Sequence, residues 1–184
     1  LIGALPNLGL IAVGTAGYEA VDLEAAAKRG IAVTHTPDVT ANDVADLAFG
    51  LLIAVARRIA EAERFIRAGH WQAGGMDFGT RVSGKRLGIV GLGAIGRTIA
   101  KRAQGFNIDV AYNGPRRKSD VSYAYHAEVV DLARTVDFLI VSCPGGSETE
   151  GLIDRSVLMA LGPEGILVNV SRGSVVDEAA LVGV

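Results

Sequence analysis

The sequence is poor in cysteine and has no surplus of charge of either sign, and both shortages exclude whole classes of protein. Its single cysteine, Cys143, allows no disulfide within the chain and no cluster of thiolates for a structural zinc site. The 18 basic and 20 acidic side chains leave a formal charge of -2, so no excess of positive charge is available to bind a polyanion. We therefore expect no metal site and no nucleic acid partner.

Long apolar runs are also missing. No run reaches the roughly 18 residues that a membrane span requires, and the opening residues LIGALPNLGLIAVG lack the charged leader and cleavage site of a signal peptide. Together with the single cysteine, this predicts a soluble cytoplasmic protein without a membrane partner. The chain begins without a methionine and stops within a predicted helix, AALVGV, so we expect a fragment of a longer protein.

The apolar residues, 49% of the chain, are grouped in patterns typical of short strands and helices. The opening stretch predicts a strand, a helix and a strand in LGLIAVG, VDLEAAAKRG and IAVTHTP, with Gly30 in the left-handed conformation that often follows a helix. From Asn42 to about Ala68, apolar residues recur at intervals of three and four, which predicts one long amphipathic helix. The glycine-rich segment HWQAGGMDFGTRVSGKR then predicts a connecting loop.

Beyond that loop, apolar strands alternate regularly with helices. The predicted strands are RLGIVG, NIDVAYN, DFLIVSC and ILVNV, and the helices lie around RTIAKRAQG, EVVDLARTV and DRSVLMALG. Near-continuous apolar strands joined by crossover helices are typical of a parallel sheet covered on both faces. The expected fold class is therefore α/β, a doubly wound parallel sheet of the Rossmann type.

Carboxylates stand near the beginning of two predicted helices. Asp43 and Asp46 lie near the start of the long helix, and Asp177 and Glu178 begin the last helix. A negative charge complements the positive end of a helix dipole, and an Asp side chain can accept hydrogen bonds from the first free N–H groups. We expect all four to serve helix N-termini.

Three glycines, Gly91, Gly93 and Gly96, form a G-x-G-x-x-G pattern between a predicted strand and a predicted helix. Gly91 would permit the tight turn, Gly93 the close approach of a pyrophosphate, and Gly96 the close packing of helix against strand. The free N–H groups at the helix N-terminus would bind the anion. The pattern in this context predicts a dinucleotide site, and the alternative is a glycine-rich turn that binds nothing.

The residues after the second strand of this motif indicate which dinucleotide is bound. An Asp or Glu normally stands there to accept the ribose 2′-hydroxyl of NAD, but this chain has Asn113 followed by Arg116, Arg117 and Lys118. Arginine binds phosphate through two parallel charge-assisted hydrogen bonds, and a carboxylate would repel it. This favours NADP as the cofactor, with NAD still possible. The alternative is that the basic loop is ordinary solvated surface.

Four motifs in order resemble the D-isomer-specific 2-hydroxyacid dehydrogenases, within them the glyoxylate/hydroxypyruvate reductase branch. The motifs are GTAGYEAVDLEAAAKRGIAVTHTP, NDVADLAFGLLIAVAR, GLGAIGRTIAKRAQGF and VSCPGGSETEGLIDRSVLMALGPEGILVNVSRGSVVDEAAL. The resemblance implies that residues 1–40 are part of a flavodoxin-like substrate domain. Residues 41–184 would be a nicotinamide dinucleotide-binding domain that is incomplete at its C-terminus. The long helix and the following GHW resemble the dimerisation arm of the family, which implies a homodimer.

The same resemblance assigns roles to individual positions. Ala16 and Gly17 match the turn whose backbone N–H groups bind the substrate carboxylate, and Arg172 matches the catalytic arginine, which also contacts substrate and cofactor. The positions that match the cofactor site are Gly91, Leu92, Gly93, Ala94, Ile95, Gly96, Asn113, Arg116, Arg117, Cys143, Pro144, Val170, Ser171 and Arg172.

Arg172 also stands out without the family pattern, because it follows the carboxyl end of a predicted central strand, where doubly wound sheets bind ligands. A guanidinium there could bind the carboxylate of a 2-oxo acid and polarise the carbonyl that accepts hydride. The reaction also needs a proton donor, normally a histidine tuned by a carboxylate. The resemblance implies that both lie beyond residue 184, and none of His35, His70 and His126 matches the family's acid. The segment around His126, YAYHAE, is predicted as a loop.

The sequence thus predicts an oxidoreductase that reduces glyoxylate or hydroxypyruvate to the D-2-hydroxy acid with NADPH, although this fragment would be inactive alone. One alternative is an NAD-dependent 2-hydroxyacid dehydrogenase acting on another small 2-oxo acid. A second alternative, of a different class, is a nucleotide-sensing corepressor that binds the cofactor without turnover.

Overall fold

The computed structural model describes residues 2–183. Residue 1 of the first predicted domain and residue 184 of the second lie outside the described part. The chain divides into two compact units, residues 1–41 and 42–184, here called the small unit and the large unit. None of the helices in the described residues is long and apolar enough to cross a membrane.

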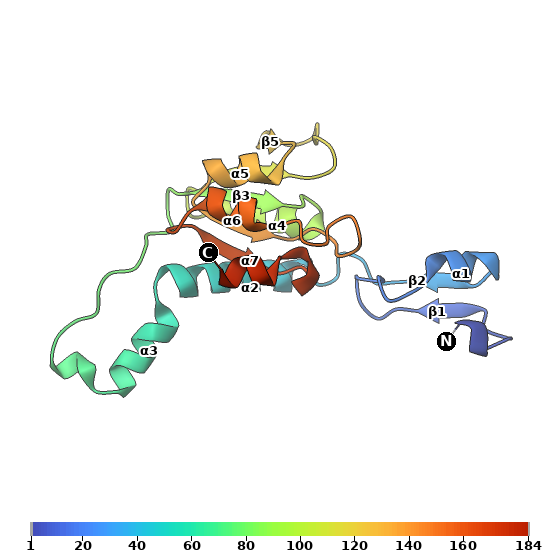
Figure 1. The fold of residues 1–184 in the computed structure, drawn as a ribbon, viewed down its shortest axis with the longest axis horizontal. Helices are drawn as coiled ribbons and strands as arrows, with labels where there is room; N and C mark the ends of the chain where they lie inside the picture. Colours follow the sequence, from blue (N-terminus) through green and yellow to red (C-terminus); the bar gives the residue numbers. More distant parts are fainter. Residues whose placement is uncertain (1, 184) are drawn as a thin grey trace. The chain divides into compact units, whose positions relative to one another are not determined.

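The small unit is a strand–helix–strand motif, as predicted (Figure 1). Its two strands pair in parallel, with Leu10 opposite Ala32. The Asp22 carboxylate begins the helix by accepting a hydrogen bond of 2.8 Å from the Ala25 N–H. Gly30 follows the helix at φ 65°, the predicted left-handed conformation. The elements are the 3-10 helix η1 (Ile2–Ala4), strand β1 (Leu10–Ala12), helix α1 (Leu23–Lys28) and strand β2 (Ala32–Thr34).

The large unit is built on a five-stranded parallel sheet, which confirms the predicted doubly wound fold. The strand order is β5-β4-β3-β6-β7, so the chain enters at the middle strand and builds outward on both sides. The strands are β3 (Arg86–Val90), β4 (Asp109–Asn113), β5 (Ala124–His126), β6 (Phe138–Val141) and β7 (Ile166–Asn169).

Helices cover both faces of this sheet, and each face has its own hydrophobic core (Figure 1). Successive side chains of β3 point to opposite faces, so Leu87 and Ile89 join the core beneath α2 and α4, whereas Val90 joins the core beneath α5 and α6. The helices are α2 (Ala41–Ala56), α3 (Ile59–Arg67), α4 (Ala94–Gln104), α5 (Val129–Thr135), α6 (Arg155–Leu161) and α7 (Glu178–Val182), with 3-10 turns η2 (His70–Gln72) and η3 (Gly173–Val175).

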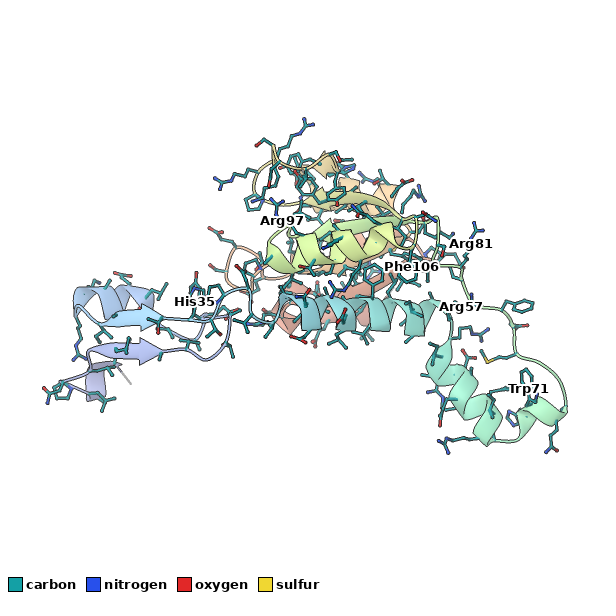
Figure 2. All side chains as sticks on the ribbon, turned by 180° about the vertical axis from the view of Figure 1, so that it is seen from behind. His35, Arg57, Trp71, Arg81, Arg97 and Phe106 are labelled. Atoms are coloured by element: carbon teal, nitrogen blue, oxygen red, sulfur yellow. The ribbon has the colours of Figure 1, made fainter. Side chains whose placement is uncertain are left out.

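The prediction of one long helix over residues 42–68 is wrong, because the helix breaks between α2 and α3. Arg58 has left-handed backbone angles, φ 54° and ψ 38°, and the Ala56 carbonyl accepts a hydrogen bond of 2.7 Å from the N–H of Thr80. The returning loop thus uses a carbonyl that a continuous helix would need. A Cβ on Gly79 would overlap the same carbonyl oxygen. Figure 2 shows α3 leaving the line of α2 just beyond Arg57.

Two smaller predictions are also corrected. The segment around His126, predicted as a loop, forms the edge strand β5, which is only three residues long and pairs with β4. Asp46 does not serve a helix end. Its carboxylate forms an ion pair of 2.6 Å with Arg102 Nε on α4 and so joins two helices on the same face of the sheet. Asp177 does cap α7 as predicted, accepting a hydrogen bond of 2.9 Å from the Ala180 N–H.

Candidate functional site

The predicted site residues of the large unit gather at the carboxyl edge of the sheet. The last residues of four strands lie opposite one another, with Val90 beside Asn113 and Val141, and Val141 beside Asn169. Because the strands are parallel, the segments that follow them all begin at this one edge, where open α/β sheets bind their ligands. Those segments, together with Asn113 at the end of β4, contain every cofactor-binding position predicted for the large unit.

The three glycines of the β3–α4 turn have the geometry predicted for them. Gly91 has φ 93°, and a Cβ there would lie 2.6 Å from the backbone N and Cα of Cys143, so only glycine fits. A Cβ on Gly96 would overlap the carbonyl oxygen of Gly91, so its absence lets α4 pack closely on the turn. Around Gly93 nothing lies within 4 Å of the Cβ position. The space in front of Gly93 is open to a ligand.

Helix α4 presents its N-terminus to that open space. Gly93, which follows the buried Leu92, is the N-cap residue, and no side chain hydrogen-bonds to the first-turn N–H groups of Ala94, Ile95 and Gly96. Uncapped N–H groups and the positive end of the helix dipole form a binding site for an anion such as a pyrophosphate. The turn therefore fits the diphosphate of a dinucleotide.

Asn113 ends β4, where a ribose would be bound, but its side chain also has a structural task. It is 7% exposed, and its Nδ2 donates to the carbonyls of His126 (3.0 Å) and Ala127 (2.8 Å) in and after β5. Both amide hydrogens are thus used within the protein, and the carboxamide oxygen is the atom that could accept from a ribose hydroxyl. Arg116 and Arg117 are exposed and have no side-chain partner among residues 2–183.

At the end of β6, Cys143 contributes its backbone and not its thiol. The side chain is buried, and burial raises the pKa of the thiol, so it stays protonated at neutral pH. The Cys143 carbonyl accepts a hydrogen bond from Ser171 Oγ at the end of β7. Pro144, which is exposed, accepts at its carbonyl from Thr149 Oγ1 at 2.7 Å. These bonds shape the backbone beside the glycine turn.

The segment after β7 is held by a residue that the sequence did not single out. The Asn169 side chain accepts from the Ser171 N–H at 2.9 Å and donates to the Arg172 carbonyl at 2.8 Å. The Arg172 guanidinium, which is exposed, donates to the Ser171 carbonyl at 3.2 Å. Val170 packs against the core under α2 and α4. Asn169 therefore sets the backbone from which Arg172 extends.

In the small unit, the predicted carboxylate-binding turn has both of its carbonyls occupied. His35 Nδ1 lies 2.9 Å from the Ala16 oxygen, and Thr15 Oγ1 donates to the Gly17 oxygen at 2.9 Å. The carbonyl requires a donor, so Nδ1 carries a hydrogen. In a trans peptide the N–H points opposite to the C=O, so the N–H of Gly17 points away from His35. The His35 ring, labelled in Figure 2, contacts Tyr18 edge-on at 4.9 Å.

The other two histidines lie in η2 and β5, and His126 is paired with Asn113 across the sheet. His70 begins η2 and contacts Phe65 of α3 edge-on at 5.4 Å, and His126 ends β5. In residues 2–183, no three His, Cys, Asp or Glu side chains are grouped so that they could hold a metal ion.

A parallel sheet, a glycine turn and an uncapped helix N-terminus together define a dinucleotide-binding α/β domain of the Rossmann class.

The family follows from comparison with known proteins. A family model described as D-isomer specific 2-hydroxyacid dehydrogenase, NAD binding domain, matches residues 49–184. The chain therefore belongs to the D-isomer specific 2-hydroxyacid dehydrogenases, as its motifs predicted.

Two curated relatives have the same level of identity. The glyoxylate/hydroxypyruvate reductase A of Arabidopsis thaliana and the hydroxyphenylpyruvate reductase of Plectranthus scutellarioides are each 46% identical to this chain over 182 residues. Each alignment covers 99% of this chain and 58% of the relative. The chain thus spans less than two thirds of the length of these proteins.

A solved structure is similar over the same extent. The NADPH-dependent glyoxylate/hydroxypyruvate reductase of Sinorhizobium meliloti, in complex with NADP and malonate, superimposes with a TM-score of 0.94 at 42% identity. The match covers 99% of this chain and 58% of that chain.

Proposed function

We propose that the protein of which this chain is a part reduces a small 2-oxo acid, glyoxylate or hydroxypyruvate, to the D-2-hydroxy acid with NADPH. One observation carries the proposal: Arg172 extends from a backbone that Asn169 fixes at the same sheet edge as the glycine turn. A cation of this kind, next to a dinucleotide site, suits a substrate that carries a carboxylate. Family membership and the reductases among the relatives support the same reaction.

In the proposed mechanism, Arg172 binds the substrate carboxylate and polarises the neighbouring carbonyl, so that negative charge developing on its oxygen is stabilised. The proton for the new hydroxyl would come from an acid of the longer protein that is not among the residues of this chain. In the small unit, His35 and Thr15 hydrogen-bond to the carbonyls of Ala16 and Gly17, and the assignment of the N–H groups of this turn to a carboxylate rests on the family resemblance alone. When bound, the nicotinamide supplies the hydride. The glycine turn and the N-terminus of α4 bind its diphosphate.

The cofactor preference is proposed from the loop after β4. Asn113 stands where a carboxylate would favour NAD, and Arg116 and Arg117 are exposed and unpaired among the described residues. Two guanidinium groups without an internal acceptor suit a 2′-phosphate. The relative from Sinorhizobium meliloti was solved with NADP, which agrees with this preference.

We further propose a cytoplasmic homodimer, with a second copy covering the arm formed by α2, α3 and η2. One face of α2 is buried on the sheet, whereas its other face exposes large apolar side chains at intervals of four. Large exposed apolar patches mark interaction surfaces. The exposed apolar residues along the arm and its loop are Leu47, Leu51, Val55, Ile59, Ile66, Trp71 and Phe78.

The reaction is tested by following NADPH absorbance as glyoxylate, hydroxypyruvate and hydroxyphenylpyruvate are added in turn to the full-length protein. We expect turnover with the first two, and at least a hundredfold loss of kcat/KM in Arg172→Gln, because a cation that binds and polarises the substrate is removed. Lys101→Gln, which removes a surface cation on α4, serves as the matched control. NADPH binding without turnover of any 2-oxo acid would contradict the proposed reaction.

Hydroxyphenylpyruvate is the competing substrate, because a hydroxyphenylpyruvate reductase is as similar to this chain as a glyoxylate/hydroxypyruvate reductase. A higher kcat/KM for hydroxyphenylpyruvate than for either small acid would assign the protein to the aromatic substrate.

The dimer is tested by sedimentation of the protein and of the variants Trp71→Ala and Phe78→Ala. We expect the dimer to weaken when these exposed rings are removed.

A further inference from the structure

The backbone of the basic loop after β4 is hydrogen-bonded at both ends, although Arg116 and Arg117 have no hydrogen-bond or ion-pair partner among residues 2–183. At the end of the loop, the Lys118 N–H donates to Tyr112 Oη at 2.6 Å. At its beginning, Tyr125 Oη donates to the Gly114 carbonyl at 3.1 Å. Two phenol groups thus close the loop at both ends and enclose Arg116 and Arg117, the residues proposed to bind the 2′-phosphate.

The two tyrosines are neighbours across the sheet. Tyr112 in β4 lies directly opposite Tyr125 in β5, and their rings are 5.4 Å apart. Side chains opposite one another on adjacent strands point to the same face, so both hydroxyls reach the loop from the same side. The short edge strand β5 therefore supplies one of the two attachment points of the loop.

The hydroxyl of Tyr112 is not needed for packing. Its ring is 1% exposed and belongs to the core under α2 and α4, where a phenylalanine would fill the same volume. A buried hydroxyl is unfavourable unless it is hydrogen-bonded, and the bond it receives comes from the loop. The hydroxyl group that distinguishes Tyr from Phe at this position therefore serves to hydrogen-bond the loop backbone.

The chain that leaves the loop is attached to the helix of the glycine turn. Asp120 forms an ion pair of 3.0 Å with Arg97 on α4, and the hydrogen bond from Arg97 lowers the pKa of Asp120. Figure 2 labels Arg97 on that helix. Because Arg97 is occupied in this way, the cations left to meet a phosphate on the ribose are those of the loop, Arg116, Arg117 and Lys118.

We propose that Tyr112 and Tyr125 are positioning residues that determine cofactor selectivity, because their hydroxyls hold the loop in the one shape that presents Arg116 and Arg117 to a 2′-phosphate. The inference rests on the proposed preference for NADPH. Neither tyrosine contacts the cofactor in this account. A loop ordered before binding does not lose conformational entropy when the phosphate arrives, and this raises affinity.

The test uses two probes that differ only in the phosphate of interest, 2′,5′-ADP and 5′-AMP, titrated calorimetrically into the chain. In Tyr112→Phe/Tyr125→Phe, we expect 2′,5′-ADP to bind about tenfold more weakly, with the affinity for 5′-AMP changed by less than about twofold. Tyr125→Phe alone, at the half-buried position, gives a second variant that disturbs the core less. Tyr123→Phe is the matched control, because its hydroxyl accepts from Gln104 Nε2 at 3.4 Å and not from the loop.

A double-mutant cycle separates positioning from general stability. In a background of Arg116→Ala/Arg117→Ala, the tyrosine substitutions should no longer change the affinity for 2′,5′-ADP, because no guanidinium is left to position. An equal loss of both probes, or an unchanged affinity for 2′,5′-ADP, would overturn the inference while leaving the NADPH preference intact. If the unmodified chain bound both probes equally, the NADPH preference itself would be contradicted, and the inference with it.

Discussion

The small and the large unit are built from the same strand–helix–strand motif, yet the fraction of strand residues that is buried differs greatly between them. In β6 of the large unit all four residues are buried, whereas in β1 and β2 of the small unit only the middle residue is even half-buried. The buried residues of the small unit are Ala26, Ile31 and Ala41. The large unit buries large side chains on both faces of its sheet.

This difference shows that local signals can specify a strand–helix–strand motif even where little apolar surface is buried. Asp22 caps α1 and Gly30 ends it, but Leu10 of β1 remains 55% exposed. Hydrophobic stabilisation grows with the apolar area removed from water, and within residues 2–41 two three-residue strands and one short helix remove little. We therefore expect the small unit to open at a much lower free energy than the large unit.

The largest expected effect comes from removing a core side chain of the large unit. Phe138→Ala should lower the free energy of unfolding of the large unit by about 3–5 kcal/mol, because the Phe138 ring is fully buried in β6 and its loss leaves a cavity. Hydrogen exchange resolved by segment would measure it, with β3 and β6 losing protection and β1 and β2 unchanged.

Ile31→Ala is the matched change in the small unit, where few neighbours surround the site. It should lie near the lower end of the range for such substitutions, about 2 kcal/mol, and leave β6 unaffected. Loss of protection in both units from either substitution would show that they unfold together, and would break the comparison.

A smaller effect is expected in the glycine turn. Gly96→Ala should cost the large unit about 1–3 kcal/mol, because its Cβ would overlap the carbonyl oxygen of Gly91. Gly93→Ala, where the Cβ meets open space, should leave stability unchanged and weaken NADPH binding by about tenfold or more, because the methyl group occupies the approach of the diphosphate. Urea denaturation and NADPH titration of both variants separate the two roles.

For the small unit, Gly30→Ala gives the contrasting case. A Cβ on residue 30 would also meet nothing within 4 Å, so the expected loss of about 1 kcal/mol in the free energy of unfolding comes only from the left-handed backbone.

If Gly93→Ala lowered the free energy of unfolding as much as Gly96→Ala, steric overlap would not be what distinguishes these two glycines of the turn.

The smallest effect concerns an ion pair that joins the middle strand to its neighbour. Asp137 Oδ2 accepts from the Arg86 N–H at 2.9 Å and Nε at 3.1 Å, and Oδ1 accepts from Nη2 at 2.9 Å. Side-chain hydrogen bonds from Arg86 lower the pKa of Asp137. Asp137→Asn should therefore destabilise the large unit by about 1 kcal/mol at pH 7, a value that allows for solvent screening of the half-exposed Arg86.

The sign of the pH dependence follows from that lowered pKa. The stabilisation is present above the unfolded pKa of about 4 and is lost as the pH falls through the lower pKa of the folded protein. Denaturation of wild type and Asp137→Asn at a series of pH values should show the two stabilities converging in acid. A difference between them that persists at the lowest pH would mean that the charge on Asp137 is not the cause.

Most of the secondary structure could be predicted because its signals lie within a few residues. The strands of the large unit are nearly continuous apolar runs, and Gly30 and Asp177 stand at helix ends with the chemistry that ends require. The break at Arg58 could not be predicted, because the apolar spacing of three and four continues through it and the bond that ends α2 comes from Thr80. Strand β5 is three residues long and polar at its edge, so no periodicity distinguishes it.

The candidate site divides in the same way. The roles of Gly91, Gly93 and Gly96 follow from their spacing, because each acts on the turn that contains it. Asn169 was not singled out, since an Asn at the end of a strand has no local mark that it will hold the two residues that follow Val170.

The sequence by itself determined where the strands and helices lie, where the dinucleotide turn is, and to which family the chain belongs, because these depend on residues close together in the chain. The tertiary structure alone decided that α2 ends at Ala56, that Asn113 is tied to β5, and that Tyr112 and Tyr125 close the basic loop. These features are hydrogen bonds that join a helix or strand to a loop or to a neighbouring strand. They exist only once the folded chain brings donor and acceptor within about 3 Å of each other.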